Sequence, residues 1–144
     1  MPRTATPKFN RIAPAERQAS LIDAGLRCLA RGGMAGFTVS QICAEAGVSP
    51  GLVLHHFGSK DGLLTAVYET MMQRLVASAE PDDEGGEERS PLQRFIAASF
   101  SADPVARHTL RAWLALWGEI ASNPVLLRAH RRQYGRYREA VEKA

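Results

Sequence analysis

The sequence predicts an all-α protein. Apolar residues recur at intervals of three and four along most of the 144 residues, and glycines or proline-containing pairs separate these periodic segments. No run of residues alternates between apolar and polar over the length of a β-strand. Hydrophobic residues make up 45% of the chain and charged residues 23%, which is ordinary for a globular protein and argues against global disorder.

The first periodic segment follows a basic arm. Residues 1–13 hold two prolines and three basic side chains, with little apolar surface to bury, so we expect a flexible arm. Residues 14–33 are predicted to form a helix, because apolar residues recur there at helical spacing and Gly32–Gly33 provides a stop. The apolar face of this helix consists of Leu21, Ile22, Leu26 and Leu29.

Two short helices are predicted next. Thr38 is a typical N-cap for a second helix, which Gly47 ends. Ser49 is a typical N-cap for a third helix, with Pro50 at the first helical position, where its missing N–H is harmless. This third helix ends at Phe57 and is too short to be stable alone, so tertiary contacts must hold it.

The rest of the chain is predicted to be helical apart from residues 80–90. These residues are expected to form an acidic, solvent-exposed loop that separates the helix before it from the helices after it. Ser-Pro, Asp-Pro and Asn-Pro pairs start the last three of the four helices expected here, at 60–79, 90–102, 103–122 and 123–144. We therefore expect a flexible arm at 1–13, a three-helix head at 14–60, and a linking helix with a helical body at 61–144.

Basic residues are concentrated at the N-terminal end. Residues 1–60 carry seven Lys/Arg and three Asp/Glu, a net charge of +4, whereas the remaining 84 residues sum to −1. A basic head on a near-neutral body is typical of a polyanion-binding N-terminus. A chance excess of solvated charges would give the same numbers.

Cysteine usage and hydropathy predict a cytoplasmic protein. Cys28 and Cys43 lie in apolar helical contexts, and two cysteines make neither a disulfide framework nor a four-ligand zinc site, so we expect buried thiols. No apolar run approaches the roughly 18 residues of a membrane span. Residues 1–11 lack the apolar core of a secretory signal.

The second and third helices have the features of a helix-turn-helix pair. Two short helices that cross steeply need a small residue where they approach, a glycine in the turn and apolar residues on both inner faces. Here Cys43 is small, Gly47 lies in the turn, and Val48 and Val53 are predicted to point inward. The combination predicts a DNA-binding head, although the glycine alone would be weak support.

The predicted contacts to DNA follow from this geometry. The N-terminal end of the third helix faces the major groove, where Leu52 could contact a thymine methyl and Ser49 could bind a base or phosphate. The free N–H groups at the start of the second helix favour a phosphate oxygen. The full set of predicted DNA-contacting residues is Thr38, Ser40, Ser49, Pro50, Gly51, Leu52, Leu54, His55, His56 and Lys60.

Two other interpretations of the same residues are weaker. A metal site at His55 and His56 is disfavoured because adjacent helical residues do not share a face. A hydrolase that uses Ser49, a histidine and Asp61 would need a strained nucleophile turn and an oxyanion hole, which the sequence does not supply. One histidine could also be structural and pack beneath Phe57. We expect no enzymatic activity, no cofactor and no metal.

The stretch "TVSQICAEAGVSPGLVLHHFGSKDGLL", residues 38–64, resembles the DNA-binding head of the TetR family of bacterial transcriptional regulators. The resemblance begins at the helix near residue 15 and covers nearly half of the chain. It implies a three-helix head, a linking fourth helix, and a helical C-terminal domain for ligand binding and dimerisation. At Leu54 the family often has a tyrosine that touches phosphate, so that contact would be lost here.

A finer resemblance concerns the effector. The segments "SPGLVLHHFGSKDGLL" and "RAWLALWGEIASNPVLLRAHRRQYGRYREAV" are similar to the choline-responsive branch of this family. Trp113 and Trp117 are four residues apart and share a helix face, and an aromatic face can bind a quaternary ammonium such as choline by cation–π attraction. The alternative that both tryptophans simply pack in the core stays open.

The resemblance also implies a homodimer bound to a double-stranded operator. Family members usually continue past residue 144 into two helices that form the dimer interface, so we expect either a fragment or another mode of dimerisation. The apolar residues Trp113, Leu114, Leu116, Trp117 and Ile120 would then be partly exposed. The competing hypothesis is a helical interaction module that retains the head fold without operator function.

Overall fold

The computed structural model describes residues 13–79, 90, 93, 96–97 and 103–142, and every regular element in that part of the chain is a helix. These helices are α1 (Pro14–Gly36), α2 (Val39–Ala46), α3 (Gly51–Phe57), α4 (Lys60–Ala79), α6 (Pro104–Ile120) and α7 (Pro124–Glu142). The all-α prediction is confirmed. The predicted basic arm lies outside the described residues except for its last residue, Ala13, and so does most of residues 80–102.

The helix starts follow the capping residues that the sequence indicates. The Thr38 hydroxyl accepts a hydrogen bond from the Gln41 N–H at 3.2 Å. The Asp103 carboxylate accepts one from Ala106 N–H at 3.3 Å, and the Asn123 side-chain oxygen accepts from two N–H groups in the first turn of α7. Each cap satisfies backbone donors that have no partner within the helix.

One expected helix boundary agrees with the structure and one differs. Gly33 has a non-helical conformation (φ 60, ψ −152), so the first helical segment breaks at the predicted Gly32–Gly33 stop, and a further helical turn then continues to Gly36. The extra turn has a physical reason, since the Phe37 N–H donates to the Met34 carbonyl at 3.1 Å and the Phe37 ring is fully buried. The prediction of a Ser49 cap is wrong: α3 begins at Gly51, and no side chain caps its first turn.

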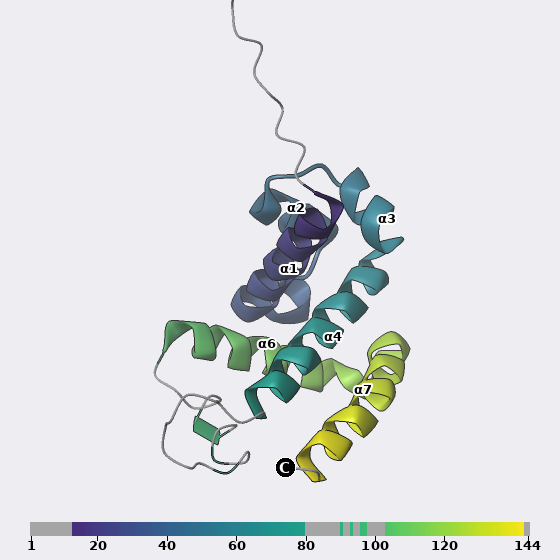
Figure 1. Ribbon diagram of the computed structural model, residues 1–144. Helices are drawn as coiled ribbons and strands as arrows, with labels where there is room; N and C mark the ends of the chain where they lie inside the picture. The colour runs from purple at the N-terminus through teal and green to yellow at the C-terminus, as the bar shows by residue number, and fades with distance from the viewer. Residues whose placement is uncertain (1–12, 80–89, 91–92, 94–95, 98–102, 143–144) are drawn as a thin grey trace, which may run out of the picture.

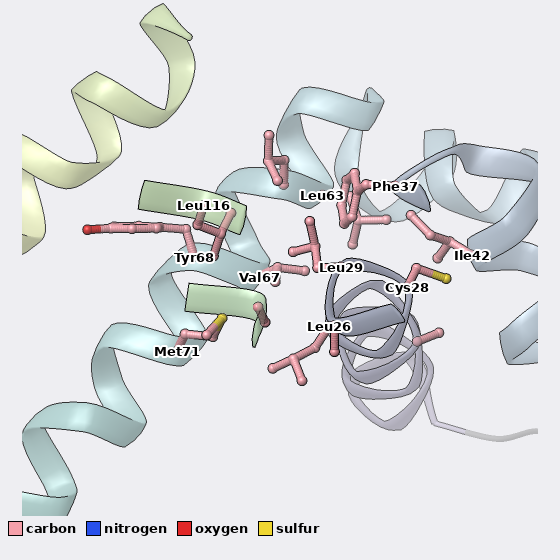
Figure 2. Packing of buried hydrophobic residues seen from close by; sticks show 14 of the residues in the cluster. Leu26, Cys28, Leu29, Phe37, Ile42, Leu63, Val67, Tyr68, Met71 and Leu116 are labelled. Atoms are coloured by element: carbon pink, nitrogen blue, oxygen red, sulfur yellow. The ribbon is translucent and has the colours of Figure 1, made fainter. Parts of the chain in front are cut away.

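One hydrophobic core runs through the described helices. Figure 2 shows Cys28 and Leu29 of α1 packed near Phe37 and Ile42, while Leu63, Val67, Tyr68 and Met71 line α4. Leu116 of α6 and Leu126 of α7 belong to the same cluster and are fully buried. The predicted head and body therefore share one hydrophobic core within the described residues.

The helices are arranged around α4. In Figure 1, α1, α2 and α3 lie together at one end, and α4 runs from α3 toward the other end with α7 alongside it. Helix α6 packs on α1, and α2 also packs on α1. None of the described helices is both long and apolar enough to cross a lipid bilayer.

Candidate nucleic-acid interface

The turn between α2 and α3 has the conformation that a helix-turn-helix pair needs. Gly47 adopts a left-handed conformation (φ 67, ψ 36), which a glycine takes at no steric cost. The Val48 N–H donates to the Cys43 carbonyl at 3.0 Å and closes the turn. Val53 is fully buried and Val48 packs against the core, so both inward predictions are confirmed.

The predicted DNA-contacting residues all lie at or near the surface of the head. Leu54 is 61% exposed, and none of the ten residues is buried. Thr38, Leu52 and His56 are half-buried, and the exposed ones are Ser40, Ser49, Pro50, Gly51, Leu54, His55 and Lys60. The structure thus places the ten residues on α2 and its N-cap, the turn before α3, α3 itself and the start of α4, at the end of the molecule away from the free end of α7 (Figure 1).

The two histidines differ in their surroundings. Their rings make an edge-on contact with centroids 4.9 Å apart, and the half-buried His56 ring lies 6.4 Å from the Phe57 ring. Within the described residues, no group of three or more His, Cys, Asp and Glu side chains lies close enough to hold a metal ion. His55 is the more exposed of the two and is free to meet an anion.

An ion-pair cluster between α1 and α2 was not predicted from the sequence. Glu45 accepts hydrogen bonds from Arg27 Nε at 2.7 Å and from Arg31 Nη2 at 2.5 Å. Hydrogen bonds from Arg31 and Arg27 hold the pKa of the Glu45 carboxyl below its usual value, and Glu45 in turn raises the pKa of Arg31. No local pattern marks these residues, because Glu45 is 14 and 18 positions from its partners.

The candidate effector residues lie on one face of α6, as predicted. The Trp113 and Trp117 rings have centroids 5.4 Å apart, but Trp113 is only 7% exposed whereas Trp117 is 48% exposed. Trp113 also meets the Tyr68 ring edge-on at 5.8 Å. Trp113 therefore packs in the core, and Trp117 is the tryptophan with an accessible face.

Tyr68 connects three helices at this point, which the sequence did not indicate. Its ring is fully buried, and its hydroxyl lies 2.7 Å from His130 Nδ1 on α7. Burial raises the pKa of Tyr68 to about 12, so the hydroxyl stays protonated and can donate a hydrogen bond to the imidazole nitrogen. In Figure 2 this hydroxyl is directed away from α1.

Two protein-family models match the chain. Residues 21–67 match the bacterial regulatory proteins of the tetR family, and residues 88–144 match the C-terminal region of BetI-type transcriptional repressors. The HTH-type transcriptional regulator BetI of Paraburkholderia phytofirmans is 36% identical over 121 residues, which cover 78% of this chain and 58% of that protein. This chain therefore spans less than two thirds of the length of that relative.

Solved structures agree with these matches. A protein from Pseudomonas aeruginosa PAO1 described as a transcriptional regulator is 41% identical, with a TM-score of 0.71 over 92% of this chain and 65% of that one. A TetR-family regulator from Rhodococcus sp. is 26% identical, with a TM-score of 0.72 over 84% of this chain and 64% of that one. This chain belongs to the TetR family of bacterial regulatory proteins, with an N-terminal domain of that family followed by a BetI-type C-terminal region.

Proposed function

We propose that the chain is a DNA-binding transcriptional repressor that binds its operator as a homodimer in the bacterial cytoplasm and responds to a small-molecule effector. The supporting observation is the orientation of the α2–α3 pair. Its inner face, with Ile42 and Val53, is buried. Its outer edge, which comprises residues 49–52 and Leu54, is mostly exposed and is not covered by α6 or α7 in Figure 1. An exposed edge of this kind can enter the major groove.

The residues on this edge divide into three roles. Ser49, Pro50, Gly51 and Leu52 approach base edges, with the exposed part of Leu52 offered to a thymine methyl. Thr38 and Ser40 place the N-terminus of α2 against a phosphate, which accepts from its free N–H groups. His55, His56 and Lys60 supply further phosphate contacts at the flank, next to the exposed Leu54.

For the effector, we propose a small cation such as choline that binds at the exposed face of Trp117, with Trp113 fixing the orientation of the Trp117 ring. A quaternary ammonium over an indole face gains about 0.5 to 2 kcal/mol by cation–π attraction. The ring contact at 5.4 Å and the 48% exposure of Trp117 support this site. The match of residues 88–144 to BetI-type repressors gives further support.

Effector binding would change the affinity for DNA because the effector site and the head are joined by packed helices. Tyr68 of α4 contacts both Trp113 of α6 and His130 of α7, and α6 also packs directly on α1 of the head. A displacement of α6 therefore acts on α1 and α4 together and shifts the spacing of two heads in a dimer. A coupling free energy of about 1 to 3 kcal/mol would give a several-fold to hundred-fold change in DNA affinity.

Selection from a pool of random-sequence duplexes tests the DNA-binding role. We expect the chain to enrich a common sequence and to bind it with an affinity that falls steeply with salt, because phosphate contacts release counterions. Addition of choline should weaken the binding and raise the melting temperature of the chain. Failure to enrich any sequence would contradict DNA recognition, whereas enrichment without a choline effect would contradict only the effector.

A second candidate function is a helical protein-interaction module without operator binding. It is favoured by apolar side chains on the surface of α6, since Val105 and Leu114 are exposed together with Trp117. Light scattering after size exclusion separates the two candidates. A dimer at micromolar concentration supports the repressor, and a strict monomer supports the interaction module.

A further inference from the structure

We infer that Glu45 is a positioning residue for DNA recognition, which fixes the C-terminal end of α2 and through it the turn that carries α3. The inference rests on the proposed DNA-binding function. It concerns a residue outside the exposed edge that meets DNA, since Glu45 is directed at α1 through its two arginine partners. Its effect on DNA is therefore indirect.

The geometry of the cluster fixes the carboxylate in two directions. Arg27 binds Oε1 and Arg31 binds Oε2, so each oxygen has its own donor on α1. The two arginines are four residues apart and therefore lie on the same face of α1, one turn from each other. The Arg31 guanidinium also lies 3.9 Å from the sulfur of the buried Cys28, which restricts its own position.

Glu45 lies on the side of α2 next to the one that enters the core. Ile42 and Cys43 anchor one face of the helix in the core. On the neighbouring side, residues of both α1 and α2 line an open hollow of about 470 Å³, and the ion-paired Arg31 and Glu45 are among them. The hollow is lined by Cys28, Arg31, Gly32, Gly36, Gln41, Ala44 and Glu45.

The location of Glu45 in the chain connects this cluster to the DNA-binding edge. Glu45 is two residues before Gly47, and a side chain placed at Gly47 would meet no atom within 4 Å. The Gly47 side of the turn is therefore open, and the turn is held by the Val48 N–H bond to the Cys43 carbonyl in the last turn of α2, so the direction in which the chain leaves α2 follows the position of that last turn. A small rotation there moves Ser49 to Leu54 relative to the groove.

A positioning role and a purely electrostatic role predict opposite results. Glu45→Gln removes one negative charge from the head and releases two arginines. If charge alone mattered, binding to every DNA sequence would become tighter, because the phosphate backbone attracts the added positive charge. If Glu45 positions α3, binding to the preferred sequence becomes weaker while binding to unrelated DNA does not.

The experiment measures the affinity of the chain for two probes: the duplex that the wild-type chain selects from a random-sequence pool, and a scrambled duplex of equal composition. The quantity compared is the ratio of the two affinities. For Glu45→Gln we expect this ratio to fall by about tenfold, comparable with the loss of one base contact. Glu16→Gln is the matched control, since Glu16 is exposed on α1 and makes no ion pair within the described residues. Its ratio should stay as in the wild type.

A charge-exchanged variant tests the ion pair itself. Arg31→Glu with Glu45→Arg places the carboxylate on α1, where it can bind both Arg27, four residues away, and the new arginine on α2. We expect the affinity ratio to return toward the wild-type value, because two residues in contact compensate each other when both are exchanged. Circular dichroism and thermal melting of each variant monitor the fold.

The outcomes separate the inference from the function on which it rests. An unchanged ratio in Glu45→Gln, an exchanged variant as poor as the single one, or loss of the folded state in Glu45→Gln would each overturn the positioning role alone. If the wild-type chain selects no sequence, the DNA-binding function falls and the positioning role falls with it.

Discussion

At the level of single residues, the proposed DNA-binding edge offers few polar groups to the bases. Gly51 has no side chain, Leu52 is half-buried, and Leu54 presents an apolar surface that is 61% exposed. We therefore expect sequence discrimination at such an edge to come from apolar contacts and DNA shape, and we expect Lys60 and the histidines to add affinity without discrimination.

Lys60→Ala and Leu52→Ala should therefore have different effects on DNA binding. Loss of the Lys60 charge weakens binding to all sequences about equally and reduces the slope of log affinity against log salt by about one. Leu52→Ala should change which sequence is selected and leave the salt slope unchanged. Salt titrations and pool selections with both variants check this, and identical behaviour would contradict the division of roles.

Glu45 should also make the stability of the chain depend on pH. Its two arginine partners lower its pKa in the folded protein below the unfolded value, so its contribution is present above the unfolded pKa and is lost as pH falls through the folded one. The difference in unfolding free energy between wild type and Glu45→Gln should be constant near neutral pH and shrink in acid. Urea titrations between about pH 6 and pH 3 measure it; a difference that persists unchanged in acid would argue against the ion pairs.

At the level of single elements, the α2–α3 turn provides a matched pair of glycines. Both have open space where a side chain would go, but Gly47 has φ +67 whereas Gly51 does not have a positive φ. Gly47→Ala should cost about 1 kcal/mol of stability through left-handed strain, and Gly51→Ala should raise stability by about 0.5 kcal/mol. Urea unfolding of both variants tests this. Equal losses would contradict the assigned turn geometry.

One hydroxyl contributes a hydrogen bond to the contact between α4 and α7. Tyr68→Phe keeps the buried ring but removes the hydrogen bond to His130, so it should destabilise the chain by about 1 kcal/mol. Tyr134, which is half exposed on α7, provides the control, and Tyr134→Phe should have no measurable effect. Thermal or urea unfolding distinguishes the two, and equal stability of both variants would show that the Tyr68 hydroxyl contributes nothing.

Local features of the chain were predictable from the sequence and distant contacts were not. The caps at Thr38, Asp103 and Asn123 and the turn at Gly47 depend on residues within a few positions, so the sequence identifies them. The Glu45 cluster and the bond between Tyr68 and His130 join residues 14 to 62 positions apart, which only tertiary packing brings together. The sequence identifies the break at Gly33 but not the helical turn after it, because that turn leads into Phe37, which only tertiary packing buries.

At the level of the whole molecule, the shared core makes head and body one mechanical unit. Buried side chains continue from Leu21 and Phe37 in the head through Tyr68 to Leu116 and Leu126. A dimer would need to hold two heads about 34 Å apart or at a multiple of this distance. Because the buried residues form one cluster, the proposed effector would act by moving packed helices together, which favours a two-state response.

The basic surface of α7 gives the main alternative location for DNA on the molecule. Exposed arginines lie along this helix, and only some of them have acidic partners among the described residues. A location at α7 would predict DNA contacts without any role for α2 and α3. The exposed arginines of α7 are Arg128, Arg131, Arg132, Arg136 and Arg138.

Hydrogen exchange of the chain with and without its selected duplex distinguishes these locations most directly. We expect DNA to slow exchange of backbone amides in residues 38–41 and 49–60, with little direct protection of residues 124–142. Protection confined to 124–142, with residues 49–57 exchanging as fast as in the free chain, would contradict DNA recognition by the α2–α3 edge.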